Sequence, residues 1–242
     1  MKLLIVRHAD PDYDMDSLTE TGWVEAELLA KRLEKLDVKA FYVSPLGRAK
    51  DTASLTLKAM GREAQECQWL REFKAQVRKP YEDQEGIAWD WIPQSWTDDA
   101  LCYDPDRWME SRRFQGTQVA EEYRWVTEEF DRLLASHGYV REGNHYRAVV
   151  PHEETIVLFC HFALECVLLS HLLHVSPMVL WHGLCAAPSS VTTVVTEERR
   201  EGIAIFRTLA FGDTSHLYVA GREPSFAARF CETYGNESQR RD

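Results

Sequence analysis

The sequence lacks a long uncharged, apolar stretch. The longest candidate, Thr155 to Leu173, is interrupted by two histidines and Glu165, whereas a membrane-spanning helix needs roughly 20 predominantly apolar residues. The apolar N-terminal run meets Arg7 almost at once, too early for the apolar segment of a secretory signal. We therefore expect a cytoplasmic protein that does not bind membranes.

Paired cysteines and an excess of positive charge are also missing. The six cysteines lie far apart without a Cys-x-x-Cys spacing, so the sequence predicts reduced, mostly buried thiols and neither a zinc knuckle nor a disulfide framework. Lysine and arginine number 28 against 39 aspartates and glutamates, and no long basic run occurs. Because a net charge of -11 repels a phosphate backbone as a whole, we expect no nucleic-acid partner.

What is present is an alternation of short apolar runs and amphipathic helical patterns. We predict strands at Leu3–Val6, Phe41–Val43, Thr155–Cys160, Val191–Thr196 and Ile203–Leu209, helices from Thr19, at Leu46–Met60, Val119–Leu134 and Ala163–Leu173, and a hairpin within His137–Val150. This order predicts an α/β fold: a three-layer α/β/α sandwich with a mostly parallel central sheet and some antiparallel pairing late in the chain. The length of 242 residues fits a single domain, 1–242.

A tryptophan-rich segment at about 74–118 breaks the alternation and is interpreted as an inserted cap region. Three prolines prevent long helices in it, and its four tryptophans are Trp89, Trp91, Trp96 and Trp108. Two interpretations stay open. The indoles form a small core of the insertion itself, because they bury large areas wherever they fall, or some of them line a substrate pocket.

Two histidines directly follow predicted parallel strands. His8 comes after Leu3–Val6 and His161 after Thr155–Cys160, and ligands of open parallel sheets bind beyond the carboxyl ends of the strands. Arg7 adjoins the first histidine, and Arg48 lies in the first turn of a predicted helix. Guanidinium groups bind phosphoryl oxygens in bidentate fashion. The pattern predicts a phosphate site and hence a small phosphorylated substrate.

The same residues carry a family resemblance that extends from Leu3 to about Leu173. The chain resembles the histidine phosphatase superfamily, also called the phosphoglycerate-mutase-like family, in five motifs that occur in the family's order. They are Leu4-Ile5-Val6-Arg7-His8-Ala9, Leu18-Thr19-Glu20-Thr21-Gly22, Ser44-Pro45-Leu46-Gly47-Arg48-Ala49 with Thr52-Ala53, Leu70-Arg71-Glu72, and Val157-Leu158-Phe159-Cys160-His161-Phe162.

The resemblance implies a phosphatase that hydrolyses a small phosphomonoester through a phosphohistidine. In it, His8 is the nucleophile, Arg7, Arg48 and His161 hold the phosphoryl oxygens, and Glu72 is the proton donor. No metal and no cofactor are implied, because side chains supply the positive charge. The residue type of His8 suits the nucleophile's role, because an imidazole with a pKa of about 6.5 is substantially neutral at pH 7.

Two departures from the family pattern concern glycines. Ala9 and Phe162 stand where the family has glycine, which restricts the backbone and places an aromatic ring near the pocket. The loop between His8 and Leu18 is short and lacks the asparagine-bearing, glycine-rich stretch of sugar-phosphate mutases. Hydrolysis is therefore favoured over phosphoryl transfer back to the substrate.

Alternatives remain at this stage. One is a phosphomutase of the phosphoglycerate mutase type, and another is a non-catalytic phospho-ligand binding protein on the same fold. A metal-dependent hydrolase is disfavoured because the sequence has no His-Glu-x-x-His motif. His216 is a candidate for supporting the site from behind, whereas His171 and His174 are interpreted as structural. Basic side chains between Arg71 and Lys79 are interpreted as a solvated charged face or as a local collector of anions.

Overall fold

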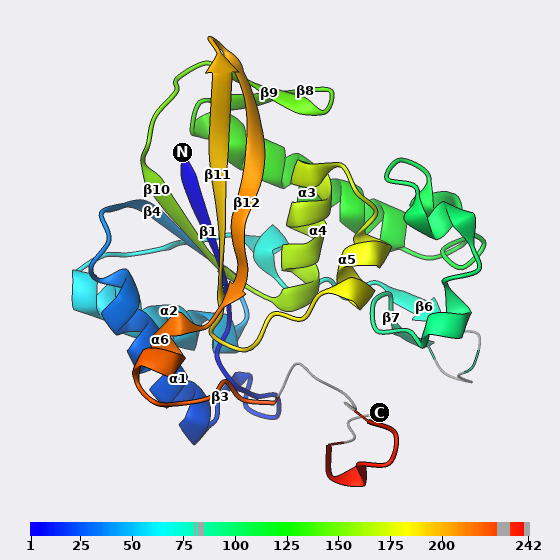
Figure 1. Cartoon of the computed structure of the whole chain (residues 1–242), viewed down its shortest axis with the longest axis horizontal. Helices are drawn as coiled ribbons and strands as arrows, with labels where there is room; N and C mark the ends of the chain where they lie inside the picture. Colours follow the sequence, from blue (N-terminus) through cyan, green and yellow to red (C-terminus); the bar gives the residue numbers. More distant parts are fainter. Residues whose placement is uncertain (80, 82–84, 227–232, 240–242) are drawn as a thin grey trace.

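The computed structural model describes residues 1–79, 81, 85–226 and 233–239. Its centre is an eight-stranded sheet with the order β5-β4-β10-β1-β11-β12-β9-β8 (Figure 1). The strands of this sheet are β1 (Lys2–Arg7), β4 (Val38–Val43), β5 (Gln65–Glu66), β8 (Tyr139–Glu142), β9 (His145–Ala148), β10 (Thr155–Cys160), β11 (Val191–Arg200) and β12 (Ile203–Asp213).

The sheet is parallel on one side and antiparallel on the other. β1 pairs with β10, β10 with β4, and β4 with β5, all in parallel, whereas β11, β12, β9 and β8 are joined by antiparallel pairings. The predicted α/β fold is confirmed, and the mostly parallel sheet is found in part. Parallel pairing follows the helical crossovers, while β8 with β9 and β11 with β12 form two hairpins, which pair in antiparallel.

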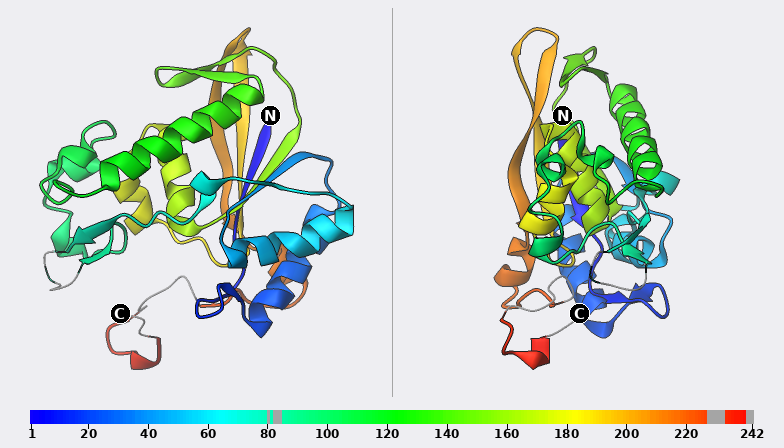
Figure 2. Two further views of the ribbon diagram at one scale, coloured as in Figure 1. Left: turned by 180° about the vertical axis from the view of Figure 1, so that it is seen from behind. Right: turned by 90° about the vertical axis from the view of Figure 1, so that its right-hand side faces the viewer.

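Helices cover both faces of the sheet, which gives the three layers. They are α1 (Glu20–Leu33), α2 (Gly47–Met60), α3 (Val119–Ser136), α4 (Phe162–Leu173), α5 (Pro177–Gly183) and α6 (Ser215–Val219). Leu4 and Val6 of β1 point into the core beneath α1 and α2, whereas Leu3 and Ile5 point into the core beneath α3 and α4. The alternation follows from the two-residue period of a strand, and Figure 2 shows the helices on both sides of the strands.

Local signals explain where the first helices begin and end. Thr19 caps α1, because its side chain accepts a hydrogen bond from the backbone of Gly22. Helix α2 ends at Gly61, whose φ of 62° lies in the left-handed region that favours glycine. The sequence analysis did not predict α5 or α6. A serine cap and a proline at the first position begin α5, a signal that was present but short.

The tryptophan-rich insertion contains little regular structure. It has a two-stranded ribbon, β6 (Gln76–Arg78) and β7 (Glu85–Ile87), followed by three short 3₁₀ turns, and lies at the end of α3 away from β8 and β9 (Figure 1). Trp91, Trp96 and Trp108 are buried in the same core as α3, α4 and α5. Trp89 is half-buried. Most of the indoles therefore fasten the insertion to the main core rather than to a core of its own.

Two further expectations concern cysteines and membranes. Among the cysteines that the structure describes, Cys67, Cys102, Cys160 and Cys166 are buried thiols, and Cys185 is exposed. Cys231 lies outside the described residues. In the part of the chain that the structure describes, no helix combines the length and the apolar character needed to cross a bilayer.

Candidate active site

The two predicted histidines come together because their strands are neighbours. β1 and β10 pair in parallel with Arg7 opposite Cys160, so the next residues, His8 and His161, leave the sheet side by side. Their ring centroids are 5.1 Å apart, and the backbone N–H of His8 donates to the carbonyl of Cys160. The parallel register thus converts two distant sequence motifs into one site.

The surroundings of His8 fix its tautomer. Its Nδ1 lies 2.8 Å from the carbonyl oxygen of Ala9, and since a carbonyl can only accept, Nδ1 carries the proton. Nε2 then bears the lone pair, and it makes no hydrogen bond within the described residues. Burial and the charges of Arg7 and Arg48 hold the pKa of His8 well below its ordinary value. A neutral imidazole with an available lone pair is a nucleophile.

His161 is oriented as a hydrogen-bond donor toward the same space. Ser44 Oγ lies 2.7 Å from His161 Nε2 and also accepts from the backbone N–H of Leu46. The hydroxyl can donate its own proton to Nε2, and the tautomer that this arrangement requires has its ring proton on Nδ1. This Nδ1 is buried and has no partner in the described part of the chain. Burial and the neighbouring His8 and arginines lower the pKa of His161 well below 6.5.

Arg48 is positioned by a loop that the sequence analysis did not connect to it. Its Nη1 donates to Asp16 Oδ1 at 2.6 Å, and Asp16 Oδ2 accepts from the backbone N–H of Gly47. A Cβ on Gly47 would meet the carbonyl oxygen of Asp16 at 2.0 Å, so only glycine permits this approach. Arg48 Nε is buried without a partner among the described residues, so this N–H is available to an anion.

Arg7 is buried at the end of β1. Its Nη1 donates to the carbonyl of Ala186 at 2.6 Å, and its guanidinium lies 6.0 Å from the ring centroid of Phe162. The backbone just after His8 is held by Thr52 of α2, whose hydroxyl accepts a hydrogen bond from the backbone N–H of Ala9. Two arginines and two histidines from β1, α2 and the β10–α4 junction therefore form one cluster, in which both guanidinium charges act on both imidazoles.

Ala9 and Phe162, which stand where the family has glycine, do not distort this arrangement. Neither Ala9 nor Phe162 is among the residues with positive φ, so both adopt backbone conformations that ordinary residues take. Ser189 does have a positive φ of 59°, and its backbone N–H donates to the carbonyl of His8. Ser189 therefore has a strained backbone conformation, and it holds the backbone of His8.

Glu72 lies at the N-terminus of α4, near Arg7 and Arg48. Its Oε1 accepts from the backbone N–H of Phe73 at 3.0 Å and of Leu164 at 3.1 Å. Burial raises the pKa of Glu72 to about 7, although the two amides and the charges of Arg7 and Arg48 oppose the shift. A carboxyl group with a pKa near the working pH can both donate and accept a proton.

Glu165 is a buried carboxyl that the sequence analysis did not assign to the site. It is 1% exposed on α4, and burial and the charge of Glu72 raise its pKa to about 8, against the opposing effects of Thr192 and Arg7. A charged residue inside the otherwise apolar stretch Ala163 to Leu173 was the signal that could have identified it, because unpaired carboxylates are rarely buried.

We expect Glu165→Gln to change the pH dependence of stability. The unfolded chain ionises Glu165 above about pH 4.5, whereas the folded chain keeps it protonated up to about pH 8. The native state therefore loses stability as pH rises through this window, by up to about 1.4 kcal/mol per pH unit. The variant should gain stability relative to the wild type between pH 5 and 8 in urea unfolding. A constant difference across this range would contradict the prediction.

The other candidates from the sequence lie around the site rather than in it. His216 Nε2 is 3.1 Å from Ser189 Oγ, so it contacts the residue that holds the His8 backbone, and burial lowers its pKa to about 4. Arg71 lies over the ring of Trp125 and 3.5 Å from Glu122.

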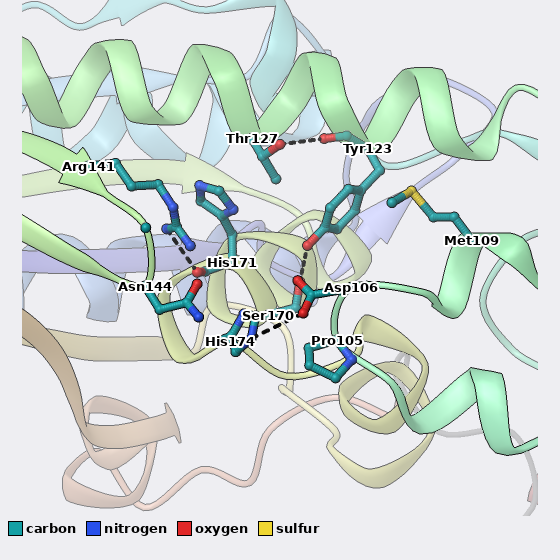
Figure 3. Close-up of a pocket in the computed structure, with 11 residues that line it drawn as sticks. Pro105, Asp106, Met109, Tyr123, Thr127, Arg141, Asn144, Ser170, His171 and His174 are labelled. Carbon is teal, nitrogen blue, oxygen red and sulfur yellow. Dashed lines mark hydrogen bonds and ion pairs between the residues drawn. The ribbon is translucent and has the colours of Figure 1, made fainter.

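A separate polar cleft of about 260 Å³ lies at the opposite end of α4 (Figure 3). There His171 pairs with Asp131 at 2.9 Å, and His174 lies 3.6 Å from Asp106. These contacts agree with the structural interpretation of both histidines. Within the described residues, no group of three or more histidine, cysteine, aspartate or glutamate side chains is arranged to hold a metal ion.

Comparison with known proteins decides the family. A sequence model described as the histidine phosphatase superfamily (branch 1) matches residues 3–207. The chain belongs to this superfamily. The resemblance that the five motifs indicated is thereby confirmed.

One curated relative matches part of the chain. A 2,3-bisphosphoglycerate-dependent phosphoglycerate mutase from Thermoplasma acidophilum is 33% identical over 97 residues, which cover 35% of this chain and 48% of the relative. The chain thus matches about half the length of this curated relative.

Two solved structures share the fold. A phosphoserine phosphatase from Entamoeba histolytica in complex with phosphoserine has a TM-score of 0.58 at 20% identity, covering 89% of this chain and 98% of that chain. A mycobacterial glucosyl-3-phosphoglycerate phosphatase in complex with VO3 has a TM-score of 0.54 at 23% identity, covering 87% and 98%.

Proposed function

We propose that this protein is a metal-independent phosphatase that hydrolyses a small phosphomonoester through a phosphohistidine on His8. The observation that carries the proposal is the pairing of His8 and His161 at the ends of adjacent parallel strands, 5.1 Å apart. Nε2 of His8 makes no hydrogen bond among the described residues, and Arg7 from β1 and Arg48 from α2 are close enough for their charges to act on both histidines.

The first half-reaction transfers the phosphoryl group to the protein. Nε2 of His8 attacks phosphorus in line, the P–O bond to the leaving group breaks, and the leaving oxygen takes the proton of Glu72. Arg7, Arg48 and Nδ1–H of His161 bind the equatorial oxygens, where the transition state spreads its charge. These donors are fixed before the substrate binds, so little reorganisation is needed during the reaction.

The second half-reaction restores the protein. Glu72, now ionised, removes a proton from a water molecule, the water oxygen attacks phosphorus, and the bond to His8 breaks to release inorganic phosphate. The pKa of about 7 suits both tasks, because the carboxyl must be protonated in the first half and ionised in the second. A carboxyl with the ordinary pKa of about 4.3 would be almost fully ionised at pH 7 and would have no proton to donate in the first half-reaction.

The proposal is tested by incubating the purified protein with p-nitrophenyl phosphate and with a panel of alkyl phosphates, and measuring phosphate release with and without a chelator. We expect turnover that the chelator does not change. Binding of phosphate or vanadate without turnover of any ester would favour the non-catalytic interpretation, and loss of activity with the chelator would contradict a metal-independent mechanism.

A mutase is the second candidate, because the chain matches a phosphoglycerate mutase over 97 residues. In this chain the 10–18 loop forms only the two-residue strands β2 (Pro11–Asp12) and β3 (Ser17–Leu18), and Asp16 of this loop occupies Nη1 of Arg48. An anionic glycerate would meet this carboxylate. With 3-phosphoglycerate we expect phosphate release without the 2-isomer, and accumulation of that isomer would establish the mutase instead.

A further inference from the structure

We propose that the substrate's leaving group is an uncharged aromatic group, bound against Phe162 and Trp89. The inference rests on the proposed phosphatase function and names the substrate class of that same site. Phe162 begins α4 directly after His161, and Trp89 belongs to the insertion. Both side chains are half-buried and pack on the main core.

The position of the acid determines where the leaving group lies. Glu72 must reach the leaving oxygen to protonate it, so the rest of the leaving group extends past this carboxyl. Glu72 Oε1 accepts from the backbone N–H of Leu164 at 3.1 Å, two residues after Phe162. The space beside the acid is consequently bordered by the first turn of α4.

Trp89 borders the same space from the insertion. Its indole N–H donates to the carbonyl of Phe73 at 2.9 Å, the residue next to Glu72, which fixes the ring. The Trp89 and Phe162 rings meet edge to face, with centroids 6.3 Å apart and an interplanar angle of 80°. We call Phe162 and Trp89 together the aromatic wall. It lies beside Glu72.

An aromatic group fits this wall better than an aliphatic one of equal size. Aromatic rings have negative faces and positive edges, so a third ring can add edge-to-face or offset contacts to the existing pair. Such a ring also excludes water from Glu72, which keeps the acid protonated.

Charge around the acid favours a neutral leaving group. Of the four basic side chains between Arg71 and Lys79, the two that are not exposed contact protein groups: Arg71 lies 3.5 Å from Glu122, and Lys79 donates to the carbonyl of Asp90. Arg48, the cation that α2 contributes to the site, is already paired with Asp16 at 2.6 Å. A carboxylate on the leaving group would therefore find Arg71 and Lys79 already engaged with protein groups.

Benzyl phosphate and cyclohexylmethyl phosphate test the inference, because both release a primary alcohol of similar size and only one is aromatic. We expect kcat/KM of the wild type to be about three- to tenfold higher for benzyl phosphate. Phe162→Leu and Trp89→Leu should bring the ratio toward one, whereas Phe162→Tyr should preserve it. Tyr218→Leu, which removes an exposed ring on α6, is the matched control and should leave the ratio unchanged.

The outcomes separate the two proposals. Equal kcat/KM for both esters in the wild type, or a ratio that survives both leucine variants, would overturn the aromatic leaving group while leaving the phosphatase intact. Failure of the wild type to hydrolyse either ester or p-nitrophenyl phosphate would instead overturn the phosphatase. Thermal unfolding of each variant shows that a changed ratio comes from folded protein.

Discussion

Replacing His8 with alanine is expected to lower turnover of p-nitrophenyl phosphate by on the order of 10⁴-fold or more, because the nucleophile that divides hydrolysis into two steps is removed. The acid-labile phosphate that wild-type protein retains after rapid quenching should disappear as well. Phosphate binding should persist, since Arg7, Arg48 and His161 remain in place. Rapid-quench measurements with a ³²P-labelled ester report turnover and the phosphoenzyme together.

His145→Ala is the matched control for this experiment. His145 lies on the exposed β9 hairpin and contacts Glu142, so its loss removes an imidazole without touching the site. Thermal unfolding of both variants checks that the fold persists. A His8→Ala protein that is folded and still forms the phosphoenzyme would show that another residue is the nucleophile.

Glu72→Gln is expected to discriminate between leaving groups. For alkyl phosphates we expect a loss of about 10²–10⁴-fold in kcat/KM, the usual contribution of a positioned acid. For p-nitrophenyl phosphate the loss in the first half-reaction should be much smaller, because nitrophenolate departs without a proton. Single-turnover measurements of nitrophenolate release isolate that half-reaction from the later attack of water.

The pH profile gives an independent check on the same residue. With a pKa of about 7 for Glu72, kcat/KM of wild-type protein for alkyl phosphates should fall as pH rises above 7, because the acid becomes ionised. Glu72→Gln should remove this decline. Glu122→Gln replaces another buried carboxyl and should keep it. Equal losses on alkyl and nitrophenyl esters, or an unchanged profile, would contradict the donor role.

The parts of the fold that could be predicted are those encoded locally. Thr155–Cys160 was predicted with the observed bounds, because a short, mostly apolar run is typical of a strand buried on both faces. Thr19 begins α1 with its side-chain cap, and Gly61 ends α2 with its left-handed backbone. β11 extends past its predicted end to Arg200 through the polar residues Glu197 to Arg200, and β12 extends past its predicted end to Asp213 through partly buried residues that include Gly212.

The site was predicted only where its residues carry a recognisable pattern. His8 and His161 follow strands, and the sheet register then brings them together. Asp16 could not be linked to Arg48 from sequence, because the contact depends on the close approach of the 10–18 loop to Gly47. The aromatic wall required a contact between Phe162 and an insertion whose path has few local signals.

A crystal structure of the protein soaked in vanadate tests the central claim most directly. The account predicts vanadium bonded to Nε2 of His8, equatorial oxygens on Arg7, Arg48 and Nδ1 of His161, and an apical oxygen facing Glu72. Vanadate bound away from His8, or held without contact to Nε2 when both arginines are engaged, would contradict it.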